Sequence, residues 1–180
     1  MFLNTVPKVY VINMDRDKNR LQFINKQFRK YNYTPERISA IATKDGEYKK
    51  YEKNFKHHIG GNDLNAISCA LSHLKAYKKI MRDNVPFGLV IEDDITVTGY
   101  ITKLPDIIKS LPQDWDVVWI GNSRSKWPRN TCSSIPDPGY DMDKVDEITP
   151  NLYRFTSDEC KNSGNCPMGC YGYLINKKAI

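Results

Sequence analysis

The sequence lacks any long apolar run, and this absence excludes a membrane-spanning helix. Such a helix needs roughly 18 to 20 consecutive apolar residues, and no stretch of the 180 residues approaches that length. The first residues carry neither the basic segment nor the apolar segment of a secretory signal. We therefore expect a cytoplasmic protein without a transmembrane segment.

The spacing of the cysteines does not fit a common zinc site. The five cysteines stand at positions 69, 132, 160, 166 and 170, an odd number that favours a reducing compartment. The last three have the pattern C-x5-C-x3-C, and no histidine follows them to complete four ligands. The alternative is a disulfide between two of these three cysteines, which requires that the protein matures in an oxidising compartment.

The sequence also lacks any run of five or six basic residues, although its net charge is positive. The 27 Lys and Arg residues against 21 Asp and Glu residues give +6, and the basic residues are spread along the chain. This distribution argues against a nucleic-acid-binding arm, so we expect no nucleic-acid partner. A positive balance suits either a lysine-rich surface or a polyanionic ligand, such as a phosphate-bearing small molecule.

What is present fits one ordinary globular domain. Hydrophobic residues make up 40% and charged residues 27% of the chain. A chain of this length buries one core but hardly two, so we predict a single domain over residues 1–180. The pattern at residues 176–180 resembles the first turn of a helix cut short, which suggests a chain truncated at its C-terminus.

The first forty residues predict a strand, a helix and a second strand. A β-branched and aromatic run at residues 9–12 predicts the first strand, and residues 37–41 predict the second. Between them lies a helix pattern that Pro35 ends. Its apolar residues, spaced by three and four, are Leu21, Ile24, Phe28 and Tyr31. Strand, helix and strand with short links are typical of a parallel α/β sheet.

The rest of the chain predicts further elements of the same kind. A helix begins at Asn62 or Asp63, and a continuous apolar run at residues 87–91 predicts a central buried strand. The expected apolar face of that helix is Ile67, Ala70, Leu71, Leu74, Tyr77 and Met81. Further elements are expected as a helix at 101–111, strands at 115–120, 152–155 and 169–175, and loops at 47–61 and 123–168. The predicted fold class is α/β, with a mostly parallel sheet flanked by helices.

Three carboxylates, Glu92, Asp93 and Asp94, follow the central strand directly. In open α/β sheets ligands bind at the carboxyl ends of the strands. Adjacent carboxylates that are partly desolvated repel one another, and a bound cation would offset that repulsion. Hard oxygen ligands suit Mn²⁺ or Mg²⁺, which would in turn hold a diphosphate. Strand alternation would send Glu92 and Asp94 to the same side, so we expect these two to face the ion. The alternative is a solvated acidic turn.

Several stretches together resemble glycosyltransferase family 25, whose members include bacterial lipooligosaccharide galactosyltransferases and procollagen galactosyltransferases. The resemblance spans nearly the whole chain, with order and spacing in agreement. The stretches that carry it are residues 9–16 with Arg20, Ala40-Ile41 with Asp45-Gly46, the Leu-Ser-His segment within 66–77, the strand and acidic residues 87–94, and residues 116–121 and 169–179.

The resemblance implies a GT-A fold, which is Rossmann-like, and an inverting transfer from a UDP-sugar donor with Mn²⁺. Glu92 and Asp94 would be the metal ligands, and Asp94 would also be the catalytic acidic residue. Asn13 and Arg16 would lie near the nucleotide, and Asp45 near the base or ribose. Ser72, His73 and Lys75 would line the helix facing the donor phosphates, with Asp93 between the two metal ligands. The acceptor would be a glycan, a lipid-linked oligosaccharide or a hydroxylysine.

Plainer interpretations of the same residues stay open. Arg16 also fits the solvated face of the first helix, His73 a buried core histidine, and Lys75 a surface lysine. An inverting transfer needs a general base to take the acceptor's proton, and the sequence does not single one out. The candidates are Asp141, Asp143, Asp158 and Glu159. A non-catalytic nucleotide-sugar-binding domain is the main alternative function.

Overall fold

The computed structural model of the chain describes residues 6–51, 64–121, 145–149, 152–155 and 171–180. Its contacts divide the chain into two compact units, one formed by residues 1–120 with 171–180 and the other by residues 121–170. Within the described residues of the second unit, β5 (Val145–Thr149) and β6 (Leu152–Phe155) pair antiparallel. The strand predicted at 152–155 is thus confirmed, while β5 lies where a loop was expected.

The first unit is built on a five-stranded sheet with the order β2-β1-β3-β7-β4. Both β2 and β3 run parallel to β1, whereas β7 runs antiparallel to β3. The strands are β1 (Lys8–Asn13), β2 (Glu36–Ser39), β3 (Phe87–Glu92), β4 (Val117–Gly121) and β7 (Gly172–Asn176). The sheet is therefore mixed, which confirms the α/β class and is consistent with a Rossmann-like fold.

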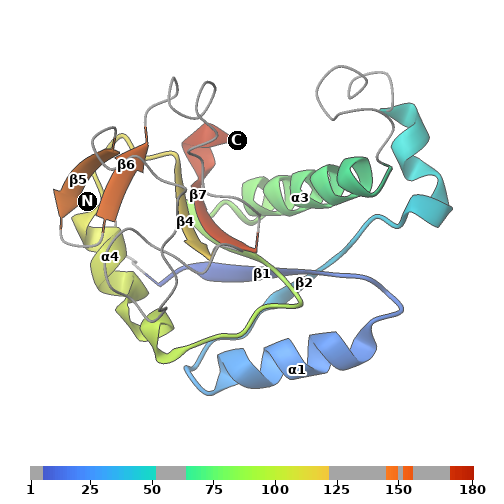
Figure 1. Ribbon diagram of the computed structural model, residues 1–180, viewed down its shortest axis with the longest axis horizontal. Coiled ribbons are helices and arrows are strands. Elements are labelled where there is room, and N and C mark those ends of the chain that lie inside the picture. Colours follow the sequence, from blue (N-terminus) through green and yellow to red (C-terminus); the bar gives the residue numbers. More distant parts are fainter. Residues whose placement is uncertain (1–5, 52–63, 122–144, 150–151, 156–170) are drawn as a thin grey trace. The chain divides into compact units, whose positions relative to one another are not determined.

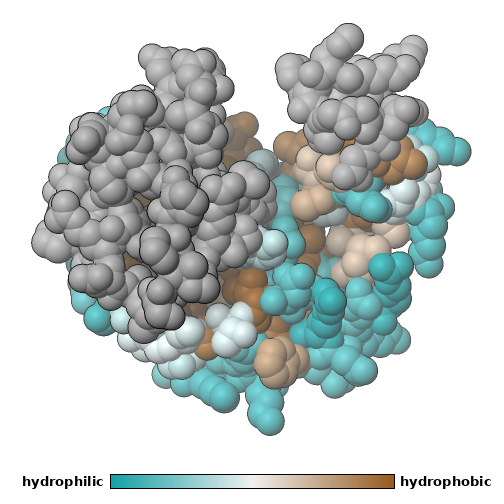
Figure 2. Space-filling view, viewed as in Figure 1, coloured by the Kyte–Doolittle hydropathy of each residue, from teal (hydrophilic) through white to brown (hydrophobic). Residues whose placement is uncertain are grey.

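Helices cover both faces of this sheet (Figure 1). The helices α1 (Lys18–Arg29) and α4 (Leu104–Ser110) pack on one face, where Ile24, Phe28 and Ile108 meet the β1 and β3 side chains Val9, Val11, Leu89 and Ile91. The long helix α3 (Leu64–Asp83) packs on the other face. Figure 2 shows mostly hydrophilic residues on the outer surface near α1, and Phe23 of this helix is an exposed apolar exception at 59%. Among the described residues, no helix is both long and apolar enough to cross a membrane.

One buried polar residue of α1 fixes the chain that follows the acidic triplet. Gln27 donates from Nε2 to the Ile95 carbonyl over 3.3 Å and accepts from the Val97 amide at Oε1 over 2.8 Å. The segment at residues 95–97 forms no regular secondary structure, so its backbone groups need other partners. The Gln27 side chain supplies two of them. The turn after β3 is consequently tied to α1.

The buried face of α3 differs from the predicted one. Leu74 and Met81 are each 44% exposed, whereas Ala76 and Ile80 are completely buried. The prediction weighted large apolar residues, but α3 packs partly through small and polar side chains that allow a close approach to the sheet. The buried residues are Ile67, Ser68, Leu71, Ser72, His73, Ala76 and Ile80.

Two other expectations are corrected at short segments. Residues 47–50, expected within a loop, form a 3₁₀ turn that follows a first one at Thr43–Asp45. Gly46 joins the two turns with a φ of 70°, a conformation that glycine adopts without a side-chain penalty. The helical turn expected after residue 176 is a 3₁₀ turn at Lys177–Ala179, where the Asn176 side chain accepts from the Lys178 amide.

An ion-pair network ties the end of α3 to the starts of β1 and β2. Lys8 Nζ lies 2.6 Å from Glu36 Oε2 and 2.7 Å from Asp83 Oδ2, and Lys79 Nζ lies 2.7 Å from Glu36 Oε1 and also pairs with Asp83. Tyr10 donates its hydroxyl proton to Asp83 over 2.8 Å. Burial by itself would raise the pKa of Asp83, but the hydrogen bonds from Lys79, Lys8 and Tyr10 outweigh it and hold that pKa well below its usual range.

We expect the Asp83→Asn variant to lose about 1 to 2 kcal/mol of unfolding free energy at pH 7, because the variant removes the charge that three donors share. Since the native carboxyl has a lowered pKa, its stabilisation is fully present above about pH 4 and is lost as pH falls further. Urea unfolding measured from pH 7 to pH 3 should show a shallower acid decline in Asp83→Asn than in the wild type. The exposed Asp106, replaced in the same way, serves as the control, and equal acid slopes for all three proteins would contradict the expectation.

Candidate functional site

The parallel strands β1, β2 and β3 end together at one edge of the sheet. Register pairs Asn13 with Ser39 and Ile12 with Glu92, so the last residues of the three strands are neighbours. The chain passes from β1 through α1 to β2 on one side, and then through α3 on the opposite face to β3 on the other side of β1. In open α/β sheets, ligands bind outside the carboxyl ends of the strands where the order reverses in this way.

Asn13, the last residue of β1, links three segments at this edge. Its side chain is 2% exposed, and its Nδ2 donates to Asp93 Oδ2 over 2.6 Å and to the Asp17 carbonyl over 3.0 Å. Its Oδ1 accepts from Arg37 Nε of β2 over 2.9 Å. A buried amide with both ends occupied holds β2, the start of α1 and the acidic triplet in one arrangement.

Arg20 of α1 provides the positive charge nearest to two of the three carboxylates. Its Nη1 lies 3.4 Å from Asp93 Oδ1 and 3.8 Å from Asp94 Oδ2. Asp93 is buried, whereas the Asp94 side chain is 43% exposed. The guanidinium therefore compensates the buried carboxylate and leaves Asp94 accessible to solvent.

The alternation expected for the acidic triplet ends with the strand. β3 stops at Glu92, and Asp93 and Asp94 form a turn. Glu92 turns toward α3, where its Oε1 lies 3.4 Å from His73 Nε2, while Asp93 and Asp94 meet Arg20 of α1 on the other face. The period-two argument for Glu92 and Asp94 was wrong, because it extended strand geometry into a turn. Their role as ligands of a cation stays a prediction.

A second charged group surrounds Asp15, just after β1. Arg37 Nη2 donates to Asp15 Oδ1, and Ser39 Oγ donates to the same oxygen over 2.8 Å. Hydrogen bonds from Arg37 and Ser39, with a smaller attraction from Lys75, lower the pKa of the Asp15 carboxyl. Lys75, predicted near the donor phosphates, thus has Asp15 within electrostatic reach.

The remaining predicted residues make other contacts. Arg16 is exposed, with its Nε 3.8 Å from Asp17 Oδ2, and Asp45 is exposed at the end of its 3₁₀ turn. Ser72 is buried; its Oγ accepts from the Ile41 amide over 2.8 Å and donates to the Ser68 carbonyl over 2.7 Å. Ser72 therefore fixes the chain after β2. The four candidate bases, Asp141, Asp143, Asp158 and Glu159, lie outside the described residues.

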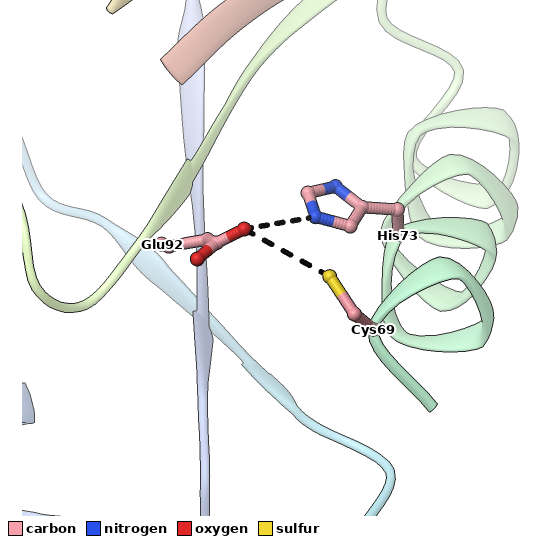
Figure 3. A group of neighbouring side chains, drawn as sticks. All are labelled: Cys69, His73 and Glu92. Carbon is pink, nitrogen blue, oxygen red and sulfur yellow. Dashed lines mark hydrogen bonds and ion pairs between the residues drawn. The ribbon is translucent and has the colours of Figure 1, made fainter. Parts of the chain in front are cut away.

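Cys69, His73 and Glu92 form a group that sequence reasoning did not assemble (Figure 3). The same Glu92 oxygen, Oε1, lies 3.4 Å from His73 Nε2 and 3.9 Å from Cys69 Sγ. His73 is buried, and its Nδ1 lies 2.7 Å from the Tyr173 hydroxyl, which in turn lies 2.9 Å from the Tyr77 hydroxyl. The available signal was the spacing of four residues between Cys69 and His73, which places both on one side of a helix.

Comparisons with known proteins give one family and a distant relative. A family model described as "Glycosyltransferase family 25 (LPS biosynthesis protein)" matches residues 6–180. A protein of Acanthamoeba polyphaga mimivirus, named a "putative glycosyltransferase", is 30% identical over 121 residues. That alignment covers 63% of this chain and 37% of the viral protein, so the chain spans well under half of this relative's length.

Proposed function

Because the chain belongs to glycosyltransferase family 25, we propose that it transfers a hexose from a UDP-sugar to an acceptor hydroxyl, with inversion and with a divalent cation. The acceptor is a glycan, a lipid-linked oligosaccharide or a hydroxylysine, and UDP-galactose is one donor to test. We also propose that the Rossmann-like sheet is the core of a GT-A fold.

The observation that carries this proposal is the polar cluster at the reversal of strand order. Asn13 fixes Asp93 there, and Arg20 lies beside Asp93 and Asp94. When a UDP leaving group departs, negative charge develops on its phosphates, and preorganised cationic groups lower the energy of that charge. Arg20, which is more than half exposed, and the half-buried Lys75 are the cations of this edge that can serve in that way.

The residues present also suit a hard cation. Glu92 and Asp94 offer carboxylate oxygens with side chains 27% and 43% exposed, so both are accessible to an ion from solvent. The contact of Asp94 with Arg20, at 3.8 Å, is too long for a strong hydrogen bond and leaves the carboxylate free to exchange partners. In this structure Glu92 faces α3 and Asp94 faces α1, so holding one ion between them requires the Glu92 side chain to turn away from His73. We propose that, after this change, Glu92 and Asp94 would hold Mn²⁺ or Mg²⁺, which would neutralise diphosphate charge as a Lewis acid.

The test is UDP binding measured by calorimetry with and without Mn²⁺. We expect Mn²⁺ to tighten UDP binding by about tenfold, which corresponds to about 1.4 kcal/mol. The variant Asp94→Ala should lose this gain because it removes a ligand, whereas the exposed control Asp106→Ala should keep it. Equal UDP affinity with and without metal, together with a silent Asp94→Ala, would refute the proposal.

A panel of UDP-sugars separates an enzyme from a binding module. Slow release of UDP from one sugar nucleotide in the presence of Mn²⁺ would identify both the activity and the donor. Tight binding without turnover toward any acceptor would instead favour a non-catalytic nucleotide-sugar-binding domain.

A further inference from the structure

We propose that Cys69, His73 and Glu92 form a binding site for a thiophilic first-row transition metal ion, with Zn²⁺ as its principal occupant. The site shares Glu92 with the carboxylate pair proposed above, so the two ions would compete for this side chain. It differs in ligand chemistry, because it combines a thiolate, an imidazole nitrogen and one carboxylate oxygen. The inference does not depend on the proposed glycosyl transfer.

The spacing of the three ligand atoms fits one small ion. Cys69 Sγ, His73 Nε2 and Glu92 Oε1 all lie within 4.8 Å of one another, and the two distances to Oε1 are 3.4 and 3.9 Å. Ligands bound at about 2.0 to 2.3 Å in a tetrahedron lie roughly 3.3 to 3.8 Å apart. Movements of up to about 1 Å would therefore bring the group to the geometry of a bound zinc ion. Within the described part of the chain, this is the one group of three or more such residues that converges in this way.

The tyrosine relay behind His73 favours a metal-binding imidazole. When His73 Nδ1–H donates to the Tyr173 hydroxyl, and that hydroxyl donates to Tyr77, the lone pair of His73 lies on Nε2. In that tautomer the Nε2 lone pair faces a Glu92 oxygen 3.4 Å away, and a metal ion between the two acceptors would be bound by both. The opposite relay, with Nε2–H donating to Glu92, is the metal-free arrangement of the same side chains. A partner that orients the second ring nitrogen is a regular feature of metal-bound histidine.

The elements that carry the ligands are well suited to a fixed site. Cys69 and His73 stand four residues apart on α3, and Glu92 ends the central strand β3. His73 is buried, while Cys69 is exposed, so an ion can enter from solvent on the cysteine side. Thiolate and imidazole select Zn²⁺ over Mn²⁺ or Mg²⁺, and three protein ligands leave a fourth position for water. Binding releases the Cys69 thiol proton to solvent, so affinity rises with pH.

Co²⁺ is the probe for this site, because its absorption reports both tetrahedral coordination and a thiolate ligand. Titrating the reduced protein with Co²⁺ should produce visible d–d bands and a near-ultraviolet sulfur-to-metal band, and one equivalent of Zn²⁺ should remove them. In Cys69→Ser the sulfur band should disappear while circular dichroism stays unchanged, because Cys69 is exposed. His73→Asn and Glu92→Gln each remove a proposed ligand. Each should therefore lower Co²⁺ affinity more than a change in Tyr173, whose hydroxyl faces His73 Nδ1 and is not itself a proposed ligand.

Two further variants make the test specific. Tyr173→Phe keeps the ring and removes the hydroxyl that faces Nδ1, so we expect Co²⁺ affinity to fall by about 10- to 100-fold. Asp94→Asn removes a ligand of the proposed hard-cation pair and should leave the Co²⁺ spectrum intact.

Two results would overturn the proposed zinc site. A sulfur band that persists in Cys69→Ser would assign the metal to the other four cysteines and overturn the proposal. The absence of any tetrahedral Co²⁺ spectrum in the wild type would do the same. Because no nucleotide enters these measurements, their failure would leave the proposal of glycosyl transfer standing, and failure of UDP binding would not affect this site.

Discussion

The variant Asn13→Asp is expected to lose about 3 kcal/mol of unfolding free energy at pH 7, although the two side chains have the same shape. The substitution replaces Nδ2, which donates to Asp93 Oδ2 over 2.6 Å, with an oxygen that accepts. Two carboxylates would then face each other inside the protein, and the Asp17 carbonyl would lose one of its two donors and keep the Leu21 amide. Chemical denaturation followed by fluorescence or circular dichroism measures the loss.

The pH dependence of Asn13→Asp gives a sharper test than the loss at one pH. A proton shared between the two facing carboxyls would restore the missing hydrogen bond, so the loss of unfolding free energy should be smaller at acid pH than at pH 7. Asn19→Asp, on the exposed surface of α1, is the matched control and should be neutral or slightly stabilising near the helix start. A neutral Asn13→Asp would show that Asn13 fills space without acting as a donor to Asp93.

The variant Ile80→Ala is expected to lose about 3 kcal/mol of unfolding free energy, whereas Leu74→Ala should lose less than about 1 kcal/mol. Both residues lie on α3, but Ile80 is completely buried and Leu74 is 44% exposed. The difference follows from the cavity that truncation leaves in a packed core. Urea unfolding of the two variants, measured side by side, provides the comparison.

Gly88 supplies an internal check on the placement of Ile80. A Cβ added to Gly88 would lie 2.7 Å from Ile80 Cδ1 and 2.9 Å from Tyr10 Cε2, so Gly88→Ala alone should be destabilising. In the Ile80→Ala background the same change should cost less, because one of the two colliding side chains is gone. If Leu74→Ala proved as costly as Ile80→Ala, and the two changes at positions 80 and 88 were additive, the packing of α3 described above would be wrong.

Much of the architecture was predictable, because local pattern and global fold agree in the first ninety residues. The apolar run at 87–91 and the periodic helix at Leu21, Ile24 and Phe28 both lie where the sequence placed them. In the strand and in the helix, the buried residues recur with the period of the element itself, so the local sequence is sufficient to predict both elements. The acidic triplet was found for the same reason, since a change from apolar to charged residues marks the end of a buried strand.

The polar contacts of the site were less predictable, because they join residues far apart in the sequence. Asn13 meets Asp93 across 80 positions, and His73 meets Tyr173 across 100. Arg20 was noted only as part of a motif, and the structure shows that it compensates Asp93. Cys69 and His73 share a helix side, but their third partner, Glu92, is set by the way α3 crosses the sheet, which no local pattern contains.

The position of β7 in the sheet has a consequence for biosynthesis. Residues 172–176 form the strand between β3 and β4, so β4 finds no edge to pair with until these later residues have been synthesised. During translation, the edge of β3 that later pairs with β7 therefore stays unpaired after β1, α1, β2, α3 and β3 have been synthesised. Apart from Gly88, the residues of β3 from Phe87 to Ile91 are all apolar. An unpaired apolar edge is a site of aggregation. Nascent chains that stall between residues 121 and 171 are thus the ones that most require a chaperone.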